Sequence, residues 1–223
     1  MKKNEVIIAP SILAANPLEL KSEIKKVEDA GGKWVHIDIM DGHFVPNLSF
    51  SPDTVKALRK VTGIFFDVHL MISEPEKYIE KFYNSGADLI TVHLETVDNP
   101  ELIAEKIHLL GIKAGISVKP GTSFDKLEKF IKFYDLVLIM TVEPGFGGQS
   151  YIEDMNEKIK ACRDYIDKSG LECYLEVDGG IKPENIYMPF ENGADVFVAG
   201  SSFFNAENPK NAFLKMCSVA QND

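Results

Sequence analysis

Eight short apolar runs, rich in β-branched residues and bounded mostly by Gly, Pro, Asp or Ser, recur along the chain. They cover Val6–Ala9, Trp34–Met40, Ile64–Met71, Leu89–His93, Lys113–Val118, Leu136–Thr141, Tyr174–Asp178 and Val196–Ala199. Between these runs, apolar residues recur at helical spacing with charged residues on the remaining positions. The helical segments are Pro17–Ala30, Ser51–Val61, Glu74–Ser85, Pro100–Leu110, Ser123–Lys132, Asp154–Lys168, Pro183–Asn192 and Pro209–Ala220. The pattern predicts eight strand–helix units of roughly 28 residues each.

This alternation predicts an α/β fold in which residues 1–223 form a single closed (β/α)8 barrel of the TIM type. An open, doubly wound parallel sheet is the second possibility. Against it, the first strand is not followed by GxGxxG, and ionisable residues end several different strands. The 223 residues, of which 45% are hydrophobic and 26% charged, fit one globular barrel without a further domain.

Charge and composition narrow the partners and the compartment. The net charge of −10 opposes a phosphodiester backbone, so nucleic acid is not expected as a partner. No apolar run reaches the roughly 18 residues of a membrane span, and no signal peptide is expected at the amino terminus, whose apolar stretch is short and interrupted by Pro10. The three cysteines are scattered without CxxC spacing, which is typical of reduced thiols and predicts a cytoplasmic protein.

Ionisable residues recur at every second position of three predicted strands. Because strand side chains alternate between two faces, residues two apart share a face. The ionisable residues are His36 and Asp38, Asp67 and His69, and Glu176 and Asp178, and the faces of the first two pairs also include Met40 and Met71, respectively. A barrel would bring these faces to one cavity at the carboxyl ends of its strands. Imidazole and carboxylate ligands suit a divalent cation such as zinc, iron(II), manganese or cobalt, although a buried polar network without a metal is the plainer alternative.

Three glycine-containing turns follow the sixth, seventh and eighth strands. They are Glu143–Ser150, Gly179–Gly180 and Ala199–Ser202. Glycines allow several backbone amides to approach one anion, and loops after the last strands of such barrels often bind phosphate. The turns therefore predict a phosphate site on neighbouring strands.

The ordered motifs resemble those of the ribulose-phosphate 3-epimerase family, from Ile7 to about Phe204. The motifs are APSIL at 9–13, HIDIMDGHFVPN at 36–47, DVHLM at 67–71, MTVEPGFGGQ at 140–149, EVDGG at 176–180 and VAGS at 198–201. The resemblance implies a ribulose-phosphate-binding barrel that interconverts D-ribulose 5-phosphate and D-xylulose 5-phosphate. The reaction is a metal-dependent 3-epimerisation, in which two carboxylates transfer protons through an enediolate.

The resemblance also implies a role for each matching residue. Asp38 and Asp178 would be the catalytic acid and base, and His36, Asp38, His69 and Asp178 would bind one divalent metal, with zinc the ion expected in a crystal. Ser11 and His69 would contact the sugar, whose reacting face Met40, Met71 and Met140 would line. The phosphate would lie on Gly145, Phe146, Gly147, Gly148, Gly179, Gly180, Gly200 and Ser201. A homo-oligomer, either a dimer or a hexamer, is expected.

Two alternatives stay open at this point. The segments Val92–Thr96 and Phe203–Asn208 resemble a sister branch that acts on a six-carbon ketose phosphate, D-allulose 6-phosphate. In that case His93 and Glu95 could face the sugar, although an ordinary polar pair at a strand end explains them as well. A barrel that binds a phosphorylated ligand without turning it over is the more distant alternative.

Overall fold

Strands of one parallel sheet form a barrel in the computed structural model, which describes residues 6–219. The strands are β1 (Ile7–Pro10), β2 (Trp34–Met40), β3 (Phe65–Met71), β4 (Leu89–His93), β5 (Lys113–Val118), β6 (Leu136–Met140), β7 (Tyr174–Asp178) and β8 (Val196–Ala199). From β2 to β8 each strand pairs with its sequence neighbour, and β1 pairs with β8. A parallel bridge between Ser11 and His36 closes the remaining gap from β1 to β2. The predicted TIM-type barrel is therefore confirmed, and the open doubly wound sheet is excluded.

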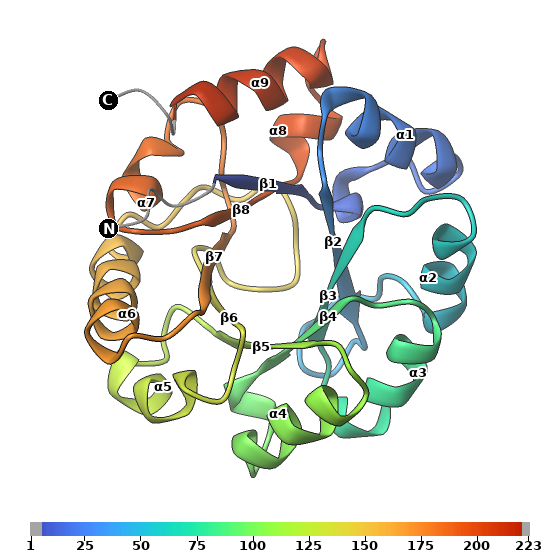
Figure 1. Cartoon of the computed structure of the whole chain (residues 1–223). Helices are drawn as coiled ribbons and strands as arrows, with labels where there is room; N and C mark the ends of the chain where they lie inside the picture. Colours follow the sequence, from blue (N-terminus) through green and yellow to red (C-terminus); the bar gives the residue numbers. More distant parts are fainter. Residues whose placement is uncertain (1–5, 220–223) are drawn as a thin grey trace.

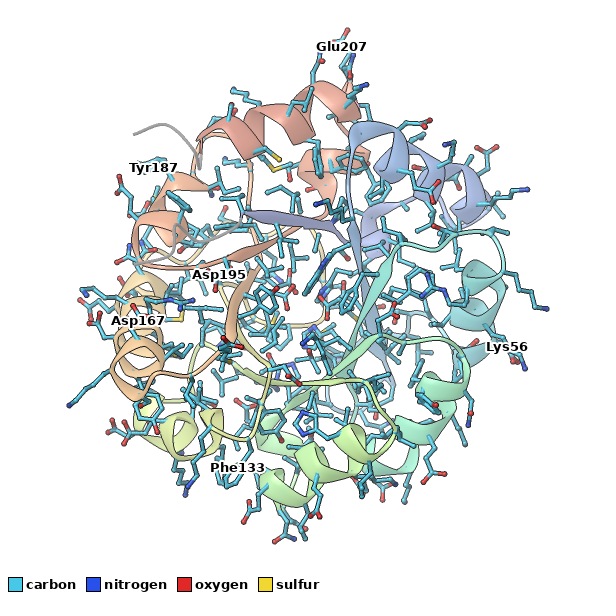
Figure 2. All side chains as sticks on the ribbon, viewed as in Figure 1. Lys56, Phe133, Asp167, Tyr187, Asp195 and Glu207 are labelled. Carbon is cyan, nitrogen blue, oxygen red and sulfur yellow. The ribbon has the colours of Figure 1, made fainter. Side chains whose placement is uncertain are left out.

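Helices surround the strands as an outer ring in Figure 1. They are α1 (Leu20–Ala30), α2 (Pro52–Arg59), α3 (Ile79–Asn84), α4 (Pro100–Leu109), α5 (Phe124–Ile131), α6 (Met155–Ser169), α7 (Tyr187–Glu191), α8 (Ser201–Phe204) and α9 (Pro209–Val219), with short 3-10 turns η1 (Ile12–Ala14), η2 (Pro75–Lys77) and η3 (Leu94–Thr96). The labelled Lys56, Asp167 and Glu207 project from this ring in Figure 2. Among residues 6–219, none of the helices combines the length and apolar character that crossing a membrane requires.

Several predicted helices are shorter in the structure. The first begins at Leu20 rather than Pro17, because Asn16 Oδ1 accepts a hydrogen bond from the Leu18 N–H at 3.1 Å and forms a turn there. The helix predicted from Pro183 begins only at Tyr187. Asn185 causes this delay, since its Oδ1 accepts from the Lys182 N–H and its Nδ2 donates to the Gly180 carbonyl, both at 2.9 Å.

Other differences concern segments where the sequence pattern merged or missed an element. The predicted helix over 74–85 splits into η2 and α3, and a short extra helix, α8, directly follows β8. The residues Met1–Glu5, where the signal-peptide expectation begins, and Ala220, the predicted end of the last helix, lie outside the described part of the chain.

Apolar side chains form two layers around the strands. The odd-numbered β2 residues Val35, Ile37 and Ile39 are buried between sheet and helices. The barrel interior is filled by a second cluster that includes Leu89, Leu136, Leu138 and Val196. At the amino ends of the strands Trp34 stacks on Phe65, with ring centroids 4.2 Å apart, and closes the barrel floor. Polar side chains of the even-numbered β2 positions therefore face an interior that is open only at the carboxyl ends.

Candidate active site

The register between β2 and β3 arranges histidines and aspartates in alternation. His36 lies opposite Asp67, Asp38 opposite His69, and Met40 opposite Met71. None of the four ionisable side chains is more than 4% exposed. The strand pairing thus places every imidazole beside a carboxylate, as buried ionisable groups require.

Four of the predicted residues converge at the carboxyl ends of β2, β3 and β7. Ligand atoms of His36, Asp38, His69 and Asp178 lie within 4.8 Å of one another. The Asp38 Oδ1 lies 3.2 Å from His36 Nε2 and 3.3 Å from His69 Nδ1. The Asp178 Oδ2 lies 4.0 Å from His36 Nε2. These two nitrogens and two carboxylates could hold a divalent metal.

His36 provides a test of whether the site fits a cation. Its Nδ1 donates to the Asp67 Oδ2 at 2.5 Å, so its Nε2 is the ring atom that faces the site. This Nε2 is fully buried and has no hydrogen-bond partner, although it faces Asp38 and Asp178. A cation at this point would satisfy the nitrogen and both carboxylates, so the residues present fit a metal.

The surroundings of Asp38 and Asp178 shift the pKa values of their carboxyl groups in opposite directions. Burial alone would raise the pKa of Asp38, but its charged neighbours, His36 foremost, outweigh burial and hold that pKa well below its usual range. Burial, and after it the charge of Asp38, raises the pKa of Asp178 to about 7. Asp38 is therefore ionised near neutral pH, whereas Asp178 can carry a proton. Such a pair can supply a base and an acid at the same site.

The two imidazoles also differ. Burial disfavours the charged form of His36, but the Asp67 and Asp38 carboxylates outweigh that penalty and raise the pKa of His36 well above its ordinary value. Burial is the largest influence on His69 and lowers its pKa. His69 is thus a neutral imidazole with a lone pair available to a ligand.

Ser11 lies against the ionised carboxylate. Its Oγ donates to the Asp38 Oδ2 at 2.5 Å, so in this structure it holds the predicted base. The three predicted methionines Met40, Met71 and Met140 are at most 5% exposed and line the base of the cavity beside Asp38 and Asp178. Their sulfur-containing chains give the cavity a dry, polarizable wall.

A cavity of about 1150 Å³ opens above these groups. Besides Ser11, Asp38, Asp178 and the three methionines, it is lined by all the residues predicted to hold phosphate: Gly145, Phe146, Gly147, Gly148, Gly179, Gly180, Gly200 and Ser201. His36 and His69 lie beneath it with no exposed surface. The three glycine turns therefore meet around one opening.

Polar side chains that the sequence analysis did not single out hold these turns in place. Asn47 Nδ2 donates to the Gly145 carbonyl at 2.8 Å, which ties the loop after β2 to the loop after β6. Gln149 Nε2 donates to the carbonyls of Glu143 and Phe146 at 2.7 and 2.9 Å. Asn47 and Gln149 both occur within motifs that already carried the family resemblance, but nothing in the spacing indicated their partners.

His93 and Glu95 do not face the cavity. His93 is fully buried and contacts His69, and neither residue is among those lining the opening. The hypothesis that this pair touches the sugar is thus not supported by their position.

Comparison with known proteins identifies the family. Residues 7–204 match the model of the ribulose-phosphate 3 epimerase family. The chain is 50% identical to "Ribulose-phosphate 3-epimerase" of Synechocystis sp. over 93% of this chain and 91% of that protein. It is 46% identical to the chloroplastic "Ribulose-5-phosphate-3-epimerase" of Arabidopsis thaliana over 92% of this chain and 74% of that protein.

A solved structure supports the fold independently. The 3-hexulose-6-phosphate synthase from Salmonella typhimurium superposes with a TM-score of 0.71 at 16% identity, covering 97% of this chain and 99% of that one. At this identity the likeness concerns the barrel alone. The family model and the curated relatives, together with the site geometry, lead to one conclusion: the chain belongs to the ribulose-phosphate 3-epimerase family.

Proposed function

We propose that the protein is a metal-dependent 3-epimerase that interconverts D-ribulose 5-phosphate and D-xylulose 5-phosphate, and that residues 1–223 form its single barrel domain. The observation that carries the proposal is the pair Asp38 and Asp178. They extend from β2 and β7, two strands that face each other across the barrel in Figure 1, and their pKa values are shifted in opposite directions. Family membership supports the same activity.

The geometry suits a proton transfer at each face of C3. Inverting this carbon requires removal of a proton from one face and its return on the other. Asp38, ionised and held by Ser11, acts as the base in one direction, and Asp178 delivers the second proton. In the reverse direction the two carboxyl groups exchange roles. The methionine wall excludes water from the enediolate that forms between these two steps.

A divalent cation fits the four residues His36, Asp38, His69 and Asp178. When bound, it supplies positive charge that stabilises the enediolate oxygens. Zinc, iron(II), manganese and cobalt all accept this mixture of nitrogen and oxygen ligands. The glycine turns after β6, β7 and β8 present backbone amides to the substrate phosphate, which explains how a chain of net charge −10 binds an anion.

The structure favours the pentose over the six-carbon substrate. The resemblance to the allulose branch depended partly on His93 and Glu95, which are absent from the cavity lining. The curated relatives with 50% and 46% identity are both named for ribulose phosphate. Assaying D-ribulose 5-phosphate and D-allulose 6-phosphate side by side would compare the two directly, and a higher kcat/KM for the hexose would overturn the assignment.

The proposal extends to assembly and compartment. We expect a homo-oligomer, either a dimer or a hexamer, and Leu48, which is 73% exposed, is available for such a contact. Light scattering of the purified protein would measure its mass. The free thiols Cys162, Cys173 and Cys217 suit a reducing compartment such as the cytoplasm.

The decisive experiment replaces each carboxylate by its amide. Asp38→Asn and Asp178→Asn should lower turnover by at least about 10²–10⁴-fold and abolish exchange of the C3 hydrogen with D2O, because each removes a proton carrier. Asp167→Asn, on the exposed face of α6, is the matched control and should retain wild-type turnover. Near-normal turnover in either site variant, with the barrel intact by circular dichroism, would refute the two-carboxylate mechanism.

A further inference from the structure

His93, at the carboxyl end of β4, lies directly behind the proposed metal ligand His69. The two Nε2 atoms are 2.9 Å apart, and the rings stack with centroids 4.9 Å apart at an interplanar angle of 28°. His93 has no exposed surface and does not line the substrate cavity. His93 therefore contacts the proposed metal ligand His69 and not the sugar.

Glu95 anchors the other side of His93. Its Oε2 lies 3.2 Å from His93 Nδ1, while its Oε1 accepts from the Lys119 N–H at 2.8 Å and from the Thr122 hydroxyl. Burial alone would raise the pKa of Glu95, but these hydrogen bonds, led by that of His93, outweigh it and lower the pKa to about 2. Glu95 is thus an ionised acceptor that is itself held by the loop after β5.

These contacts determine which nitrogen of each ring carries a hydrogen. The Glu95 carboxylate can only accept, so His93 Nδ1 carries a hydrogen. Full burial disfavours a charged imidazole, which leaves His93 Nε2 as an acceptor. His69 Nε2 then donates across the 2.9 Å contact, which would leave the lone pair of His69 Nδ1, 3.3 Å from the Asp38 Oδ1, available to a divalent metal.

The other histidine of the site, His36, is held through its Nδ1, whereas His69 is held through its Nε2. Asp67 accepts from His36 Nδ1 and leaves Nε2 facing the site. A carboxylate therefore orients the ring of both histidines, directly for His36 and through His93 for His69. Carboxylate–histidine pairs of this kind orient metal-bound imidazoles and raise their basicity.

We propose that His93 and Glu95 are positioning residues that hold His69 in the tautomer whose Nδ1 binds the divalent metal. This proposal rests on the metal-dependent function proposed above. The series of contacts Glu95–His93–His69, called the relay below, acts on metal affinity and not on substrate contact.

Cobalt binding to the full-length protein, followed by its visible absorption, tests the relay. His93→Leu removes the acceptor for His69 Nε2–H and should weaken Co2+ binding by about 10–100-fold. His93→Gln is the conservative rescue, because its amide oxygen can accept the same hydrogen, and it should restore most of the affinity. Glu95→Gln should fall between these two variants. His108→Leu is the matched control, since His108 pairs with Asp135 on the outer surface at 2.8 Å, and it should bind Co2+ as the wild type does.

Imidazole nitrogen-15 spectra of the metal-free protein provide a readout that a structural role would not change. The wild type should show His69 protonated on Nε2, and His93→Leu should show both tautomers. At saturating Co2+ the KM for the sugar phosphate should be unchanged, because His93 does not touch the substrate. If His93→Leu fails to fold, the comparison of wild type, His93→Gln and Glu95→Gln still measures the relay.

The outcomes separate this proposal from the one it rests on. If the wild type binds no Co2+ and is active without metal, the metal dependence itself is wrong. If the wild type binds Co2+ and His93→Leu and Glu95→Gln bind it equally well, only the relay is wrong. A wild-type His69 protonated on Nδ1 would also overturn the relay.

Discussion

Gly180 allows the turn after β7 to pass close to the loop after β6, so Gly180→Ala should disturb both stability and phosphate binding. The residue has φ +69°, and a Cβ added to it would lie 2.3 Å from the Tyr151 nitrogen and 2.8 Å from the Tyr151 Cα. These are backbone atoms, so no side-chain rotation can relieve the contact. The two turns that Gly180 brings together both line the substrate cavity.

The expected magnitude follows from these two effects. A left-handed conformation costs an alanine about 1–2 kcal/mol relative to glycine. Overpacking against fixed atoms adds about 1–3 kcal/mol. The free energy of unfolding of Gly180→Ala should therefore fall by about 2–5 kcal/mol. Displacement of the Tyr151 backbone should also raise the KM for D-ribulose 5-phosphate and weaken inhibition by inorganic phosphate.

Urea unfolding and steady-state kinetics would measure the two effects. The only tryptophan of the chain, Trp34, is stacked at the barrel floor and reports unfolding by its fluorescence. Gly121→Ala is the control: its added Cβ would meet nothing within 4 Å, and Gly121 is not in the cavity lining. Its stability should stay within about 0.5 kcal/mol of the wild type. If Gly180→Ala behaves like Gly121→Ala in both assays, the close approach of these two loops is not what shapes the phosphate site.

Three further predictions concern the metal, the proposed base and the thiols. Dialysis against a chelator should abolish turnover and added Zn2+ or Co2+ should restore it, whereas a fully active metal-free protein would refute the ligand assignment. Ser11→Ala removes the 2.5 Å hydrogen bond to Asp38. It should lower kcat/KM by about 10–100-fold, because a hydrogen bond to a charged group contributes about 1.5–3 kcal/mol. An unchanged kcat/KM would show that this contact does not hold the base. Burial raises the pKa values of all three thiols, to about 12 for Cys162 and Cys173. Because Cys162 and Cys173 are also at most 8% exposed, a disulfide reagent at pH 8 should react promptly only with the half-buried Cys217. All three thiols should react in denaturant, and three prompt reactions in the native protein would contradict the burial of the first two.

Local periodicity predicted most of the barrel. Strand alternation in β2 placed His36 and Asp38 on one face, and helical spacing located all but one of the α-helices described over residues 6–219. The errors arose at ends and short elements, as at Asn185, where side-chain hydrogen bonds to the backbone of Lys182 and Gly180, three and five residues earlier, delay the start of α7. Such bonds depend on side-chain chemistry within one turn and not on the spacing of apolar residues, so a periodic pattern contains no signal for them.

The sequence by itself determined which residue types share the inward faces of β2, β3 and β7, because side-chain alternation along a strand is a local property. Only the tertiary structure decided their partners. The parallel register places Asp67 beside His36, and the same packing turns His93 toward His69 and away from the substrate cavity. The physical reason is that register and ring orientation follow from contacts between strands that are separated along the chain. The sequence therefore indicated a site of two imidazoles and two carboxylates, and the fold determined which nitrogen of each imidazole faces it.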